Sequence, residues 1–231
     1  MYFDPLYFII LAPALIFSLI ATAMVKMTFA KYSRIQASSG MTGAQAAALM
    51  LSRSGTTDVK IAHAHGFLGD HYDPTTKTLN LSDDVYGSTS LSAVGVACHE
   101  AGHALQHAQG YKPLMIRSAL VPAAQFGSNF SYFFIVAGLI FSAMALVKVG
   151  IALFAAAVLF SLVTLPVEWD ASARAKRQMV VCGVVSPSEA SSAGSVLNAA
   201  FMTYIAAAAS AILTLIYYLL RSGLLGGRSR D

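Results

Sequence analysis

Four long stretches without any charged residue alternate with polar segments along the chain. They run from Leu6 to Val25, over about residues 130–147, from Val149 to Val167, and from Ala199 to Leu220. A helix needs about 20 apolar residues to cross a bilayer, so each stretch predicts a membrane-spanning helix. Lys148 separates the second stretch from the third. This spacing predicts a tight helical hairpin with Lys148 at its tip.

The polar segments between these stretches predict where a folded domain lies. With four spans, residues 26–130 and residues 168–198 fall on the same side of the membrane. We therefore expect a mainly α membrane protein with about four transmembrane helices and a small α+β domain. The predicted organisation is an anchor helix over 1–25, a first part of the domain over 26–130, a transmembrane hairpin over 131–167, a second part of the domain over 168–198, a last transmembrane helix over 199–221 and a flexible tail over 222–231.

Composition and charge agree with this interpretation and orient the chain. Hydrophobic residues make up 56% of the sequence and charged residues only 11%, which is too apolar for an ordinary soluble domain. Lys26, Lys31 and Arg34 follow the first span directly, and the positive-inside rule then predicts that this domain lies in the cytoplasm. The net charge of +4 suits an anionic lipid surface. No basic patch interleaved with aromatic residues indicates a nucleic-acid partner.

The first polar segment carries signals for both helices and strands. A capping box at Thr42 predicts a helix that ends at about Ser54. Residues 58–65 alternate as a strand does, and a short extended run over Thr78–Leu81 precedes a helix that begins near Ser90. We expect the run over Thr78–Leu81 to pair with an extended substrate by β-augmentation.

The sequence His99-Glu100-Ala101-Gly102-His103 is the strongest functional signal. Residues four apart share one face of a helix, so both imidazoles can bind one metal ion. Two His nitrogens hold zinc, and the Glu between them can take a proton from a water that the metal activates. The alternative is a buried amphipathic helix with two hydrogen-bonded histidines.

A catalytic zinc site needs a third protein ligand. Of the other two glutamates, Glu189 has a structural explanation in the capping box of Ser186-Pro187-Ser188-Glu189. Glu168 follows a long apolar run and has no such explanation, so it is the candidate ligand. His107 fits a supporting position better than a third ligand. The histidines at 63, 65 and 71 are interpreted as polar or packing residues.

Several segments together resemble the bacterial membrane zinc metallopeptidases of the YugP type, within the neutral zinc metallopeptidases. They are Asp70-His71-Tyr72-Asp73-Pro74, Leu79-Asn80-Leu81-Ser82, His99 through Gln106, and Leu165-Pro166-Val167-Glu168-Trp169-Asp170-Ala171-Ser172. The family is similar in plan to the heat-shock protease HtpX and the CAAX prenyl protease, and this similarity implies Glu168 as a zinc ligand. Those relatives usually carry an Asp four residues after the ligand, where this chain has Ser172. A supporting role for Asp170 is a weaker inference.

These observations predict that the cytoplasmic α+β part is a zincin-like catalytic domain. The protein would then be a zinc endopeptidase of the bacterial inner membrane that holds one Zn²⁺ per chain. His99, His103 and Glu168 would bind the metal and Glu100 would act as the base. Arg174, His107 and Tyr72 are candidates for stabilising the oxyanion. A polypeptide is the expected substrate, and an oligomer or a membrane-protein partner stays open.

Other functions fit the sequence less well. An intramembrane site-2-type protease would carry the motif inside a span. A four-helix transporter would carry charges within its spans. A zinc-binding scaffold that regulates another protease would not need Glu100.

Overall fold

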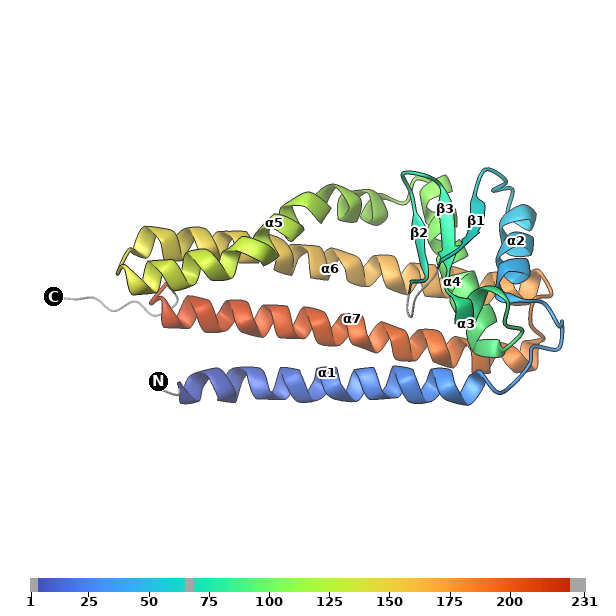
Figure 1. Cartoon of the computed structure of the whole chain (residues 1–231), viewed down its shortest axis with the longest axis horizontal. Helices are drawn as coiled ribbons and strands as arrows, with labels where there is room; N and C mark the ends of the chain where they lie inside the picture. Colours follow the sequence, from blue (N-terminus) through green and yellow to red (C-terminus); the bar gives the residue numbers. More distant parts are fainter. Residues whose placement is uncertain (1–3, 65–68, 225–231) are drawn as a thin grey trace. The chain divides into compact units, whose positions relative to one another are not determined.

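The computed structural model describes residues 4–64 and 69–224 of the chain (Figure 1). Its elements, in order, are α1 (Pro5–Tyr32), α2 (Gly43–Arg53), β1 (Lys60–His63), β2 (His71–Asp73), β3 (Thr78–Leu81), α3 (Asp83–Tyr86), α4 (Leu91–Ala108), α5 (Lys112–Ile140), α6 (Met144–Val181) and α7 (Pro187–Arg221). A mainly α membrane protein with a small α+β part is therefore confirmed. Residue 65 and the tail beyond 224, for which a prediction was made, lie outside the described residues.

Within the described residues, four helices are long and apolar enough to cross a membrane, namely α1, α5, α6 and α7. The predicted number of spans is confirmed, but the helices extend well beyond the apolar stretches. α5 begins at Lys112, and α6 continues without a break from Met144 to Val181. Glu168 therefore lies within the third long helix and not at the start of a separate element.

The turn between α5 and α6 corrects one prediction. Lys148 lies inside α6, and the chain reverses at residues 141–143, where Ser142 adopts a left-handed φ of 52°. A single lysine does not end a helix, because its long side chain reaches polar surroundings without disturbing the backbone. The two helices approach closely at Gly138, where an added Cβ would lie 2.7 Å from the backbone nitrogen of Val147.

The chain divides into two compact units. The first comprises residues 1–20, 116–165 and 203–231. Its buried cluster consists of Ile135, Val147 and Ile151, and many of its large apolar side chains are exposed. Such exposure is expected of helices whose outer faces meet lipid.

The second unit comprises residues 21–115 and 166–202 and contains the sheet. The strand order is β1-β3-β2, with β1 parallel and β2 antiparallel to β3. Thr78–Leu81 is therefore the central strand. The prediction that it pairs with substrate is wrong, because hydrogen bonds to both neighbours already occupy its backbone groups.

Helix α4 forms the centre of the second unit. The Ser90 hydroxyl caps its N-terminus by accepting from the Ala93 N–H, and residues from Leu91 to Leu105 form much of the core. Gly102 allows α4 to lie against α6, since a Cβ there would come within 2.6 Å of the Ala171 carbonyl oxygen. The second variable position of the sequence motif thus determines how closely the two helices pack.

Both predicted capping boxes make hydrogen bonds at the start of their helices. Thr42 and Gln45 form the complete reciprocal pair at α2. At α7, the Glu189 carboxylate accepts from the Ser186 N–H at 2.8 Å, as expected, and also accepts from the backbone N–H of Ser38 at 2.7 Å. Glu189 therefore joins the start of α7 to the loop that follows α1, which its capping role alone did not predict.

Candidate metal centre

The regular spacing of α4 places His99 and His103 on one face. Their ring centroids lie 4.8 Å apart, with the planes nearly perpendicular at 83°. Glu168 faces them from α6, where its Oε2 atom lies 3.2 Å from His99 Nε2 and 3.5 Å from His103 Nε2. Glu168 lies 65 positions after His103 and 69 after His99 in the sequence, and the close packing at Gly102 brings it to them.

The spacing of these donors suits a zinc ion. One donor atom from each of the three residues lies within 4.8 Å of the other two. Bonds of about 2.1 Å at tetrahedral angles place ligand atoms about 3.4 Å apart, close to the two distances measured to Glu168. Two imidazole nitrogens and one carboxylate oxygen also form the donor set of a catalytic site, which leaves a fourth position for water.

Gln106 determines which His103 nitrogen carries the proton. Its amide NH₂ donates to the Val167 carbonyl at 2.8 Å and to Asp170 Oδ2 at 2.9 Å. Its amide oxygen must then face His103 Nδ1, 3.0 Å away, so Nδ1 carries a hydrogen and neutral His103 presents a lone pair at Nε2. That lone pair points at a carboxylate that is only 2% exposed, an arrangement that needs a cation between the two atoms.

The protonation of His103 reflects the same surroundings. Burial acts to lower the pKa of His103, but the hydrogen bond from its ring to Glu168 and the charge of Glu100 outweigh burial and raise the pKa. In the absence of a metal, a proton therefore supplies the positive charge that this position favours. A divalent ion would displace that proton on binding.

Ser172 performs for His99 the role that Gln106 performs for His103. Its hydroxyl lies 3.1 Å from His99 Nδ1 and comes from α6, one turn after Glu168. The resemblance to the heat-shock protease HtpX and the CAAX prenyl protease implies an Asp at this position. A serine oxygen can accept from Nδ1–H as a carboxylate would, although it does so without a charge.

We expect Ser172→Ala to weaken zinc binding by about 10- to 100-fold, the usual effect of losing a residue that orients a metal-binding His. Ser172→Asp should strengthen binding, because a carboxylate raises the basicity of the imidazole. Competition with a chromogenic chelator measures both. Ser195→Ala is the matched control, since its hydroxyl bonds to the Ser191 carbonyl and to Tyr32 and to none of the three candidate ligands. Equal affinity in all four proteins would contradict this role for Ser172.

Glu100 lies on the neighbouring face of α4 and contacts strand β2. Its Oε2 accepts from the backbone N–H of Tyr72 at 3.1 Å. Burial raises the pKa of the Glu100 carboxyl, whereas the nearby His99 and His103 act to lower it. The structure thus places a half-buried carboxylate beside both imidazoles.

Tyr72 and His107 form a pair next to Glu100. The Tyr72 hydroxyl lies 2.8 Å from His107 Nδ1, and burial raises the pKa of Tyr72, so the phenol stays protonated at neutral pH. His107 is thus bonded to a residue of the sheet. The hydrogen bond that Tyr72 makes to Glu100 places this pair beside the candidate base.

Asp170 and Arg174 lie one step further from the donors. Asp170 accepts from Gln106 and from Arg174 Nε, and Arg174 donates to Gln109 as well. The Arg174 guanidinium also lies over the Tyr111 ring, 5.5 Å from its centroid. A chain of hydrogen bonds therefore runs from His103 through Gln106 and Asp170 to Arg174.

The other described histidines make structural contacts. His63 pairs with Asp83 at 2.5 Å, and His71 bonds to the Gly69 carbonyl at 2.7 Å. Among the described residues, His99, His103 and Glu168 form the one cluster of three or more metal-binding side chains.

Residues 7–223 match the protein family described as "Putative neutral zinc metallopeptidase". The chain belongs to this family. It is also 41% identical, over 215 residues, to the protein named "Putative membrane protease YugP" of Bacillus subtilis (strain 168), covering 93% of this chain and 96% of that one. No solved structure matches the chain. Membership implies zinc, and the cluster of His99, His103 and Glu168 is a site that fits it.

Two residues of this centre were missed by sequence reasoning. Gln106 carries no signal of its own, because a glutamine in a helix is usually exposed, yet it is fully buried here. Ser172 appeared only as a departure from the family pattern. The spacing of Gln106, three residues after His103 on the same helix face, is the signal that could have indicated it.

Proposed function

We propose that this protein is an integral-membrane zinc endopeptidase of the gluzincin type. The observation that supports this most directly is the convergence of His103 Nε2 and His99 Nε2 on a buried carboxylate, with Glu100 beside them. A purely structural zinc site would have no use for Glu100. Zinc bound by the three side chains would act as a Lewis acid that polarises the peptide carbonyl and favours deprotonation of water.

Glu100 and the residues around it would have separate roles in this reaction. Glu100 accepts a proton from the attacking water and afterwards delivers it to the leaving amine. Gln106 and Ser172 keep the His103 and His99 rings oriented, so that each presents Nε2. The Tyr72 N–H holds the Glu100 carboxylate toward β2.

We favour the Tyr72 hydroxyl, hydrogen-bonded to His107, as the group that stabilises the oxyanion. The phenol is protonated and lies on the element that contacts Glu100, and a donor placed there would meet the charge that develops on the carbonyl oxygen. Arg174 is less suitable, because its bonds to Asp170 and Gln109 hold its guanidinium at a pocket whose lining includes none of the candidate ligands or Glu100.

The expected result of metal removal tests this function. Purified protein in a maltoside detergent should cleave a fluorescently labelled unfolded polypeptide, lose that activity with 1,10-phenanthroline and regain it with stoichiometric Zn²⁺. A zinc-loaded preparation that cleaves no peptide bond in several unfolded polypeptides would favour the scaffold function instead.

We place the centre at the cytoplasmic face of the bacterial inner membrane, where extended or misfolded segments of membrane proteins are accessible. Support comes from Lys26, Lys31 and Arg34, which follow the first apolar stretch. Both native cysteines are free and buried, so single introduced cysteines can report the topology.

In intact cells, a membrane-impermeant maleimide should label Ser142→Cys, at the turn between α5 and α6, and leave Asp84→Cys, in α3, unlabelled. Both positions are exposed in the fold. Permeabilised cells serve as the control, in which both variants should react. Labelling of Asp84→Cys alone in intact cells would reverse the orientation.

A further inference from the structure

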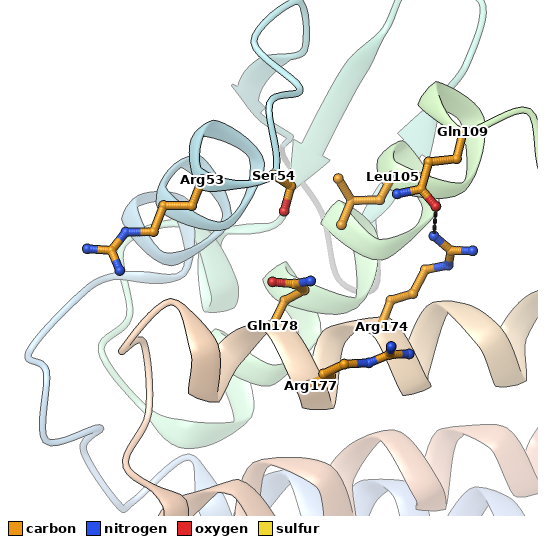
Figure 2. Close-up of a pocket in the computed structure, with 7 residues that line it drawn as sticks. All are labelled: Arg53, Ser54, Leu105, Gln109, Arg174, Arg177 and Gln178. Carbon is orange, nitrogen blue, oxygen red and sulfur yellow. Dashed lines mark hydrogen bonds between the residues drawn. The ribbon is translucent and has the colours of Figure 1, made fainter.

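A polar pocket lies in the second unit, and its lining includes none of the three candidate ligands. It has a volume of about 370 Å³, within the range of pockets that hold small ligands. Figure 2 shows its lining, which comes from the end of α2, from α4 and from α6. Its polar lining residues are Arg53, Ser54, Gln109, Arg174, Arg177 and Gln178.

The chemistry of the lining is that of an anion site. Three side chains are guanidinium groups, two are amides and one is a hydroxyl, and no carboxylate lines the pocket. Asp170 offsets the charge of Arg174 through their ion pair, but Asp170 does not itself line the pocket. The pocket therefore keeps a positive charge of about two, which favours a multiply charged anion over a single carboxylate.

One polar atom of the lining has no partner. The Ser54 Oγ is buried, and the described residues give it no hydrogen-bond partner. Figure 2 shows it directed toward the space above Gln178. A buried hydroxyl without a partner is unfavourable, and a ligand oxygen in the pocket would remove that cost.

We propose that this pocket binds a phosphate group. Arg174 is already oriented by Gln109 and Asp170, so it offers its remaining N–H groups in a defined position. Arg177 and Arg53 are exposed and can turn toward a bound anion. A phosphate has enough acceptor oxygens for these guanidinium groups and for the Ser54 hydroxyl together.

The position along α6 favours a soluble phosphate ester over a lipid headgroup. Arg174 and Arg177 follow Val167, where the apolar run ends, by seven and ten residues, or about 10 to 15 Å of helix. The headgroup layer is only about 5 to 8 Å thick on each side of the hydrocarbon core. The proposal does not depend on the peptidase function, since binding can be measured without cleavage.

The test is calorimetric titration of inorganic phosphate into the full-length protein in a maltoside detergent, at constant ionic strength. We expect saturable binding of one phosphate per chain and an affinity about 10- to 100-fold weaker in Arg177→Gln, which loses charge-assisted hydrogen bonds. Arg34→Gln is the matched control, because Arg34 is exposed in the same unit but lies outside the lining. Arg174 is left unchanged, since it is connected to His103 through Asp170 and Gln106.

Each outcome is informative. No saturable binding in wild type, or an equal loss in Arg34→Gln and Arg177→Gln, would overturn the proposal, as would binding of acetate in preference to phosphate. Repeating the titration in nanodiscs distinguishes the source of the phosphate. Affinity unchanged by phosphatidylglycerol would support a soluble phosphate ester, whereas its loss on adding that lipid would show that a lipid headgroup supplies the phosphate.

Discussion

Glu100→Gln is expected to lower the rate of peptide hydrolysis by about 10²- to 10⁴-fold, the usual contribution of a general acid–base group. Glutamine has nearly the same shape and can still accept from the Tyr72 N–H, but it cannot take a proton from water. Zinc content should stay unchanged, because Glu100 is not among the three converging donors. Initial cleavage rates and elemental analysis on the same preparation measure the two effects.

Asp84→Asn provides the control for this substitution. It makes the same change from carboxylate to amide at an exposed position of the same unit and should leave both rate and zinc content as in wild type. If Glu100→Gln retained full activity, another group would have to act as the base and the proposed mechanism would be wrong.

Glu168→Gln is expected to weaken zinc binding by more than about 100-fold. Residues that only orient a metal ligand through a hydrogen bond already change metal affinity by about 10- to 100-fold. Glu168→Gln removes a ligand itself, and it is the only acidic donor among the three. The amide also leaves the two Nε2 lone pairs without the negative charge that favours a cation between them. Zinc per chain after dialysis against a competing chelator is the direct measurement.

Asp170→Asn and His107→Gln distinguish the alternatives for the third ligand. Asp170 contacts Gln106 and Arg174, and His107 contacts Tyr72, so within the described residues neither makes a hydrogen bond to His99 or His103. We expect both variants to keep most of their zinc. Full zinc in Glu168→Gln together with loss in either of these would assign the third ligand to that residue instead.

The parts of this protein that the sequence predicts well are those in which the signal is local. The four membrane-capable helices follow from uninterrupted apolar stretches, and the α2 cap follows from Thr42 and Gln45, three residues apart. The pairing of His99 with His103 follows from the helical repeat. The predictions that were wrong concern local patterns that are compatible with more than one structure. Lys148 breaks an apolar run without breaking the helix, and a short extended segment such as Thr78–Leu81 reads the same at the edge or in the centre of a sheet.

By itself, the sequence determined the donor types, their helical spacing and the presence of one unexplained glutamate after an apolar run. Only the tertiary structure decided how these groups meet. The approach of α4 to α6 at Gly102 sets the distances to Glu168, and the amide of Gln106 fixes the His103 tautomer by donating to Val167 and Asp170. The central position of β3 likewise depends on pairing between segments distant in sequence. These features come from contacts across many residues, whose geometry depends on how whole elements pack and not on any local periodicity.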